Sequence, residues 1–143
     1  MYIGSCLCKA IEFEVDEIVG PFELCHCSRC RKTSGSSFAA MVGVNPTGYK
    51  ITKGNEHVKT IELDVFEKEP GYHHSFCEKC GSPVTLPNPD ADCLEVSAGT
   101  FDSELPISPD KHIFVELTPN WDKVKDELPT YTKDQLYVLR KKT

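Results

Sequence analysis

The amino-acid sequence predicts a single domain, residues 1–143, that is mainly β and stabilised by bound zinc. The first observation is that hydrophobic residues recur at every second position in several segments, which is the period of a half-buried strand. The second is that seven of the eight cysteines fall into three tight clusters, as in metal sites. Finally, 143 residues with 39% hydrophobic content suffice for one modest core, to whose stability a metal site would add.

The predicted elements follow from these periods and from the turn residues between them. Strict alternation of apolar and acidic or aromatic residues predicts strands at 11–15, 61–65 and 113–117. Further strands are expected at 38–44, 72–76 and 94–98, with ten prolines and nine glycines marking the gaps. Helical signals are short and lie at 28–34 and 133–142, where Leu136 and Leu139 are placed to pack inward.

The net charge and the clustered cysteines indicate the kind of binding partner and the cellular compartment. The net charge of −6 argues against a nucleic-acid partner, and the basic tail Arg140-Lys141-Lys142 is read as a solvated terminus. Residues 1–5 show no secretory signal, and no segment is long and apolar enough to span a membrane. The sequence therefore predicts a cytoplasmic protein, in which clustered thiols stay reduced and bind metal instead of forming disulfides.

The third cluster, Cys77-x-x-Cys80-Gly81, is typical of a zinc knuckle. The glycine allows the backbone to turn under the metal, with amides directed at the thiolates. A redox-active dithiol is the alternative, but it is disfavoured because that motif is expected at a helix start in a βαβ unit. A knuckle supplies two ligands, and Cys6 with Cys8, just before the first strand, is the source expected for the other two. Four thiolates would make a closed, structural site.

The middle cluster places Cys25, Cys27 and Cys30 within six residues. All three can face one ion if the chain passes from a strand end into a helical turn, and this leaves an open position for a water or substrate atom. The nearby basic residues Arg29, Arg31 and Lys32 favour thiolates. Two alternatives remain: a second structural site completed by a histidine, and an iron–sulfur cluster. The candidate histidines are His26, His57, His73 and His74.

Several motifs, in this order, resemble the family of glutathione-dependent formaldehyde-activating enzymes, which also contains the centromere protein V domain. The motifs are Gly4-Ser-Cys-Leu-Cys8, Cys25-His-Cys-Ser-Arg-Cys-Arg31 with Ser34-Gly35, Phe76-Cys-x-x-Cys-Gly-Ser82, Gly99-Thr-Phe-Asp102, His112-Ile113, and Asn120-Trp121 ahead of Leu128-Pro129. The resemblance covers nearly the whole chain, and its cysteine pattern is the specific part. Lys9 stands where many members have glycine, a change that leaves the ligands intact but is expected to alter the turn.

The resemblance implies an Mss4-like β fold with two zinc ions. It implies a structural zinc on Cys6, Cys8, Cys77 and Cys80, and a catalytic zinc on Cys25, Cys27 and Cys30. It further implies a carbon–sulfur lyase that reversibly joins glutathione, a small-molecule thiol, to formaldehyde. The alternative function is a zinc-stabilised binding module without catalysis, and an intact trio of thiolates favours the enzyme because idle thiolates risk oxidation.

Five residues outside the proposed ligands have simpler expected roles. Cys93 is expected to be a small buried apolar residue, and Trp121 to anchor the core. His26 is expected to point away from the metal, either exposed or supporting the ligands from behind. His112 is expected to be a structural residue at the start of a strand, and Asp102 to cap a turn.

Overall fold

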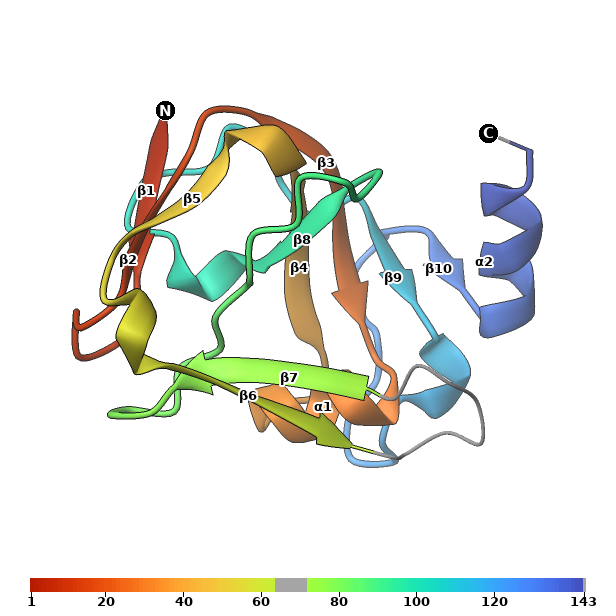
Figure 1. Ribbon diagram of the computed structural model, residues 1–143. Helices are drawn as coiled ribbons and strands as arrows, with labels where there is room; N and C mark the ends of the chain where they lie inside the picture. Colours follow the sequence, from red (N-terminus) through yellow and green to blue (C-terminus); the bar gives the residue numbers. More distant parts are fainter. Residues whose placement is uncertain (64–71, 143) are drawn as a thin grey trace. The chain divides into compact units, whose positions relative to one another are not determined.

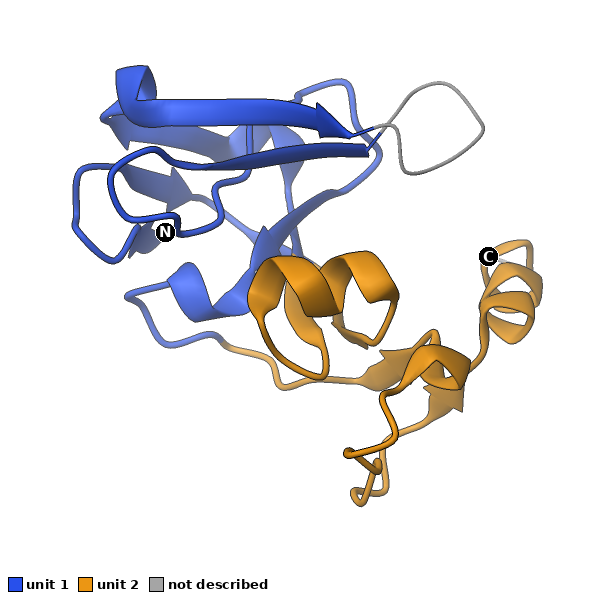
Figure 2. Cartoon of the chain, turned by 90° about the horizontal axis from the view of Figure 1, so that it is seen from below, with its two compact units in different colours: residues 1–19, 43–105 blue, residues 20–42, 106–143 orange. Residues whose placement is uncertain are grey.

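The computed structural model describes residues 1–63 and 72–142. Within these residues it has ten β-strands and two α-helices, so the chain is mainly β, as predicted (Figure 1). The chain forms two compact units. The first comprises Met1–Val19 and Gly43–Leu105, and the second comprises Gly20–Val42 and Pro106–Thr143 (Figure 2). Each cysteine cluster lies wholly within one unit.

The first unit contains a three-stranded antiparallel sheet and a separate two-stranded ribbon. The sheet has the order β1-β2-β5, where the strands are Tyr2–Ser5, Glu12–Val15 and Tyr49–Lys53. The predicted alternation at 11–15 is confirmed, because Ile11, Phe13 and Val15 are all buried. The ribbon pairs β6 (Val58–Leu63) with β7 (Tyr72–Cys77). Residues 64 and 65 of the predicted strand 61–65 lie outside the described residues.

The remaining elements of the first unit are short. Strand β8 spans Leu94–Ser97, close to the predicted 94–98, and its Leu94 and Val96 are buried. Three 3-10 helices connect the strands: η1 at Pro46–Gly48, η2 at Asn55–His57 and η3 at Ala98–Thr100. Cys93 is half-buried, not buried as expected, and it lies between the bend at Ala91 and Asp92 and the start of β8.

The second unit is built on neighbouring strands in the order β10-β9-β3-β4. These are Thr130–Tyr131, Lys111–Ile113, Ile18–Cys25 and Ala39–Val44, and β3 begins in the first unit while β4 ends in it. Strand β9 pairs in parallel with β3, in a register that places His112 opposite Leu24 and Ile113 opposite Cys25. This register places His112 of β9 beside the C-terminal end of β3.

Two helices complete the second unit, both close to the predicted positions. Helix α1 spans Ser28–Ser34 and ends at Gly35, whose φ of 65° permits the left-handed C-cap. Helix α2 spans Lys133–Arg140 and begins with a capping box between Thr132 and Gln135. Leu136 packs inward at 1% exposure, as predicted, while Leu139 is only half-buried. Arg140 Nη2 donates to the buried Glu23 Oε2 at 2.8 Å.

The predicted strand at 113–117 is wrong. Strand β9 ends at Ile113, Phe114 has a left-handed φ of 57°, and Val115–Leu117 forms the 3-10 helix η4. The physical reason is pairing: β10 pairs with β9 only at His112 and Ile113, and β3 ends at Cys25, opposite Ile113. The described neighbours therefore offer no partner beyond Ile113, and the apolar alternation alone does not keep the chain extended.

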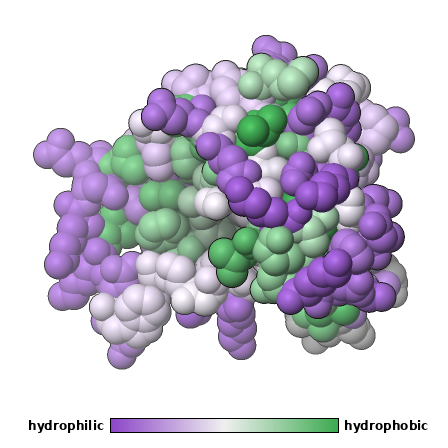
Figure 3. All heavy atoms as spheres, turned by 90° about the vertical axis from the view of Figure 1, so that its left-hand side faces the viewer, coloured by the Kyte–Doolittle hydropathy of each residue, from purple (hydrophilic) through white to green (hydrophobic). Residues whose placement is uncertain are grey.

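Trp121 is the second correction. The expected core anchor is 71% exposed, and it lies in a turn where Asp122 N bonds to Pro119 O at 3.1 Å. Figure 3 shows hydrophobic and hydrophilic side chains intermixed on one face of the molecule. No helix in the described residues is long and apolar enough to cross a membrane.

Candidate metal centres

Four sulfurs converge in the first unit. The Sγ atoms of Cys6, Cys8, Cys77 and Cys80 all lie within 4.8 Å of one another. The Sγ atoms of Cys6 and Cys8 are 3.6 Å apart, and those of Cys8 and Cys77 are 3.8 Å apart. A zinc tetrahedron with Zn–S bonds of about 2.3 Å has sulfur–sulfur edges of about 3.8 Å. The donor set and spacing of this four-cysteine cluster therefore fit a closed zinc site.

The turn between β1 and β2 brings Cys6 and Cys8 to this point. Lys9 N bonds to Cys6 O at 2.9 Å, and Ile11 N donates to Cys6 Sγ at 3.3 Å. Lys9 adopts φ 57°, the left-handed conformation that glycine adopts most readily. The turn is thus formed with lysine in place, and Lys53 Nζ donates to Lys9 O at 3.1 Å, which helps hold this backbone.

The knuckle supplies the other two sulfurs from the end of β7. Gly81 has φ 75°, and its N bonds to Cys77 O at 2.8 Å, closing the turn as predicted. The Ser82 hydroxyl lies 3.3 Å from Cys80 Sγ, and this hydrogen bond is the main cause that lowers the pKa of Cys80 to about 6. Leu7 N also donates to Ser82 Oγ at 3.0 Å, linking the two cysteine loops. The motif follows a strand and forms a turn, unlike a redox dithiol at a helix start.

Three further sulfurs converge in the second unit. Cys25 ends β3, Cys27 is the N-cap of α1 and Cys30 lies in its first turn, so the predicted passage from strand to helix is present. Their Sγ atoms lie within 4.8 Å of one another. Cys30 N donates to Cys27 Sγ at 3.4 Å, which satisfies one amide at the helix start. In residues 1–63 and 72–142, no histidine or carboxylate joins this three-cysteine cluster.

The three thiols share their protons unequally. Hydrogen bonds from Cys25 and then Cys30 hold the pKa of Cys27 far below its ordinary value, with a contribution from Arg29. The same bond with Cys27 raises the pKa of Cys25. For Cys30, the bond with Cys25 lowers the pKa, but the bond with Cys27, burial and the Cys27 charge together raise it to about 11. Three thiolates therefore require a cation among them.

The basic residues predicted near this cluster have different positions. Arg29 lies close enough to lower the pKa of Cys27 and Cys30. Arg31 Nε donates to His26 O at 3.3 Å, and Lys32 is exposed. In the part of the chain that the structure describes, none of the histidines considered as fourth ligands joins the three-cysteine cluster. For example, His57 Nδ1 lies 3.1 Å from Glu78 Oε1 in the first unit.

A buried hydrogen-bond chain beside the three-cysteine cluster was missed by the sequence reasoning. His26 is fully buried, and its Nε2 lies 2.8 Å from Nδ1 of the buried His112. His112 Nε2 in turn lies 3.0 Å from Asp126 Oδ2. Burial is the main cause that lowers the pKa of His26, followed by the charge of His112. His26 does not join the three-cysteine cluster; its ring bonds to His112 and is fully buried, so the exposed alternative is wrong.

Asp102 was expected to cap a turn, but its hydrogen bonds reach strand β1, distant in the sequence, instead. Asp102 N bonds to Ile3 O at 3.0 Å, and its carboxylate accepts from the Ser5 hydroxyl at 2.6 Å, next to Cys6. His112 lies in the middle of the three-residue strand β9, not at its head.

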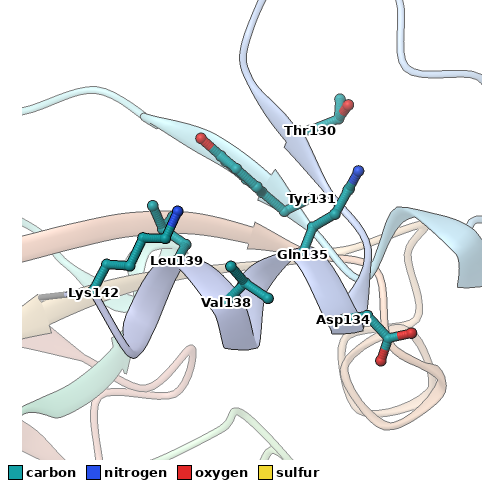
Figure 4. Close-up of a pocket in the computed structure, with 7 residues that line it drawn as sticks. All are labelled: Thr130, Tyr131, Asp134, Gln135, Val138, Leu139 and Lys142. Atoms are coloured by element: carbon teal, nitrogen blue, oxygen red, sulfur yellow. The ribbon is translucent and has the colours of Figure 1, made fainter.

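Apolar residues surround the three-cysteine cluster in the second unit. Cys25 and Cys27 share a buried cluster with Ile113 and Leu136, against which Tyr131 and Phe114 pack. Tyr131 also lines a cavity of about 450 Å³ along β10 and α2 (Figure 4). The other residues that line it are Thr130, Asp134, Gln135, Val138, Leu139 and Lys142.

Comparison with known proteins shows the family to which the chain belongs. Residues 1–117 match the family model described as "Glutathione-dependent formaldehyde-activating enzyme". A Halomonas elongata protein named "Putative glutathione-dependent formaldehyde-activating enzyme" is 31% identical over 126 residues, covering 85% of this chain and 80% of that protein. The chain belongs to the glutathione-dependent formaldehyde-activating family, and the predicted family is confirmed.

One solved structure supports the fold. A Rhodobacter sphaeroides protein of known crystal structure has 25% sequence identity and a TM-score of 0.50, covering 73% of this chain and 91% of that protein. Together with the strand content, this likeness confirms a mainly β fold with cysteine clusters suited to zinc.

Proposed function

We propose that this chain is a zinc-dependent carbon–sulfur lyase of the glutathione-dependent formaldehyde-activating type, acting on the adduct of glutathione, or a similar thiol, with an aldehyde. The observation that carries the proposal is the presence of two sulfur clusters of different size in a member of this family. Residues 1–143 would act as one domain. The protein would be cytoplasmic, since open thiolate sites need a reducing compartment.

The four-cysteine cluster is assigned to a structural zinc. Its four donors complete a tetrahedron, and its 3.6 and 3.8 Å sulfur spacings support that geometry. Cys6 and Cys77 are buried, Cys80 is half-buried and Cys8 is exposed, so an ion there would be shielded from solvent on the side of Cys6 and Cys77. Metal bound in this way adds to folding free energy.

The three-cysteine cluster is assigned to a catalytic zinc held by Cys25, Cys27 and Cys30. With three protein donors, a bound zinc would keep one position open, where it can polarise an aldehyde oxygen or lower the pKa of a substrate thiol. The position of Arg29 near Cys27 and Cys30 adds positive charge that favours thiolate on either ligand or substrate.

The reaction requires no oxidant or reductant, and no reactant besides the thiol and the aldehyde. The thiol sulfur attacks the aldehyde carbon, a carbon–sulfur bond forms, the carbonyl electron pair moves to oxygen, and the proton lost from sulfur is balanced by one gained at that oxygen. The reverse reaction breaks the carbon–sulfur bond and returns thiol and aldehyde. The part of the chain would be to hold the metal with three thiolates and to place Arg29 beside them, so that positive charge favours the substrate thiol in its thiolate form.

The test is the rate at which glutathione and formaldehyde exchange with their adduct, measured by NMR on folded, zinc-loaded protein. The wild-type protein is expected to exceed the uncatalysed rate, and Cys27→Ser is expected to abolish the excess. Cys93→Ser is the matched control, because Cys93 lies outside both clusters. A wild-type rate equal to background, with both clusters metallated, would refute the formaldehyde reaction.

A glutathione titration would then separate the two remaining functions, an enzyme with another thiol-adduct substrate and a binding module. Saturable binding that is lost in Cys27→Ser would retain a thiol-adduct substrate. The absence of binding would leave a zinc-stabilised binding module.

A further inference from the structure

His26 occupies an unusual position between two of the three clustered cysteines. Its side chain is fully buried, while Cys25 and Cys27 on either side direct their sulfurs to the same point. Neighbouring side chains in an extended segment point to opposite sides, so the His26 ring lies behind the sulfurs. Any rotation of this residue would therefore move both neighbouring sulfurs.

The backbone of His26 is held at both of its polar groups. His26 N donates to Ile113 O at 3.0 Å, which continues the parallel pairing of β3 with β9. His26 O accepts from Arg31 Nε at 3.3 Å, from the middle of α1. Two neighbouring elements thus fix the peptide units that connect Cys25 to Cys27.

The side chain of His26 is held by a chain of two further groups. The Asp126 carboxylate accepts a hydrogen bond from His112 Nε2, with both Oδ atoms at 3.0 to 3.1 Å. His112 Nδ1 lies 2.8 Å from His26 Nε2, and it accepts a hydrogen bond from His26 when the single ring proton of His112 is on Nε2. Phe38 packs against His26 and His112, with ring centroids 5.4 and 6.2 Å away, and limits tilting of the two rings.

We propose that the Asp126–His112–His26 chain is a positioning device for the three-cysteine cluster. His112 and Asp126 touch neither sulfur nor substrate in this account. Instead they fix the orientation of the His26 ring, and through its backbone the directions of the Cys25 and Cys27 sulfurs. This inference rests on the proposed function, because it assumes that the cluster holds a metal ion.

The variant that tests the device is Asp126→Ala. The Asp126 side chain is half exposed, so its removal leaves the buried core intact while His112 loses its acceptor. Asp122→Ala is the matched control: Asp122 also acts electrostatically on His26, but the chain runs through Asp126. If the negative charge alone matters, both substitutions should change the metal binding of the three-cysteine cluster. If positioning matters, only Asp126→Ala should change it.

The measurement uses cadmium-loaded protein, because cadmium NMR gives one resonance for each thiolate site. The four-cysteine resonance serves as the internal control for folding. In cadmium-loaded Asp126→Ala, we expect the three-cysteine resonance to shift and broaden. In zinc-loaded Asp126→Ala, we expect a chelator to withdraw zinc from this site at about ten-fold lower concentration than in wild type. Asp122→Ala is expected to match the wild type in both measurements.

A second pair of variants applies if Asp126→Ala does not fold. Asp126→Asn keeps an acceptor oxygen, so we expect a smaller shift and a smaller loss of zinc affinity than in Asp126→Ala, but still a larger one than in Asp122→Asn. If the Asp126 and Asp122 variants behave alike, the positioning device is refuted while the metal site stands. If the wild type shows only the four-cysteine resonance, the proposed function fails, and the inference fails with it.

Discussion

Replacing one cysteine in each cluster separates a structural from a catalytic role. Cys77 is fully buried, and its sulfur lies 3.8 Å from that of Cys8. Structural zinc binding contributes about 10 to 16 kcal/mol in small zinc domains. If Cys77→Ser removes only half of this, the loss of about 5 to 8 kcal/mol equals the entire stability of many domains, about 5 to 15 kcal/mol. We therefore expect Cys77→Ser to abolish cooperative unfolding.

Cys27→Ser should have a much smaller effect on folding. Cys27 is the N-cap of α1, and its sulfur accepts a long 3.4 Å bond from Cys30 N. Serine is among the best N-cap residues, so its hydroxyl can take over this bond. The expected change is within about 1 kcal/mol, or a shift in Tm of about 4 °C for a chain of this length.

The assay is thermal and urea unfolding followed by circular dichroism, on protein loaded with zinc and freed of excess metal. Free zinc is removed because ligand binding to the folded state would otherwise change apparent stability. Cys93→Ser is the control for a cysteine outside both clusters. Equal losses in Cys77→Ser and Cys27→Ser would refute the division into structural and catalytic ligands.

Two further substitutions test the fold around each cluster. Leu136→Ala is expected to lower the free energy of unfolding in urea by about 2 to 5 kcal/mol, because Leu136 is buried beside Cys25 and Cys27. Its control is Val138→Ala on the exposed side of α2, which should change this free energy by no more than about 0.5 kcal/mol. Equal effects of the two variants would contradict the packing of α2. Gly81→Ala is expected to cost about 1 to 2 kcal/mol and to speed zinc loss to a chelator, because its φ of 75° suits glycine. Gly99→Ala, without positive φ or close neighbours, is its control, and a neutral Gly81→Ala would show that the knuckle relaxes.

The features that the sequence predicted are those set by local chemistry. The spacing within each cysteine cluster restricts where the sulfurs can point, and the sulfurs of Cys77 and Cys80, and those of the strand-to-helix trio, converge in the structure. The helix α2 was expected from its own periodicity and is formed at Lys133–Arg140. In the same way, the alternation at 11–15 corresponds to a buried face in β2.

The features that escaped prediction depend on partners far along the chain. The pairing of His26 with His112 joins residues 86 positions apart, and only the parallel register of β3 and β9 brings them together. The apolar alternation at 113–117 failed for a related reason, since no described strand continues the pairing past Ile113. His26 precedes a cysteine and His112 precedes an isoleucine. Neither position carries a signal in a single sequence that would reveal the contact between the two histidines.

The central claim is that the chain holds two zinc ions of different lability, and metal analysis tests it most directly. Zinc per chain is measured in fully loaded protein before and after mild chelation, with folding followed in the same samples. We expect about two ions, one lost readily from Cys25, Cys27 and Cys30 without unfolding, and one retained by the four-cysteine cluster. A single ion that is removed only when the protein unfolds would contradict the account.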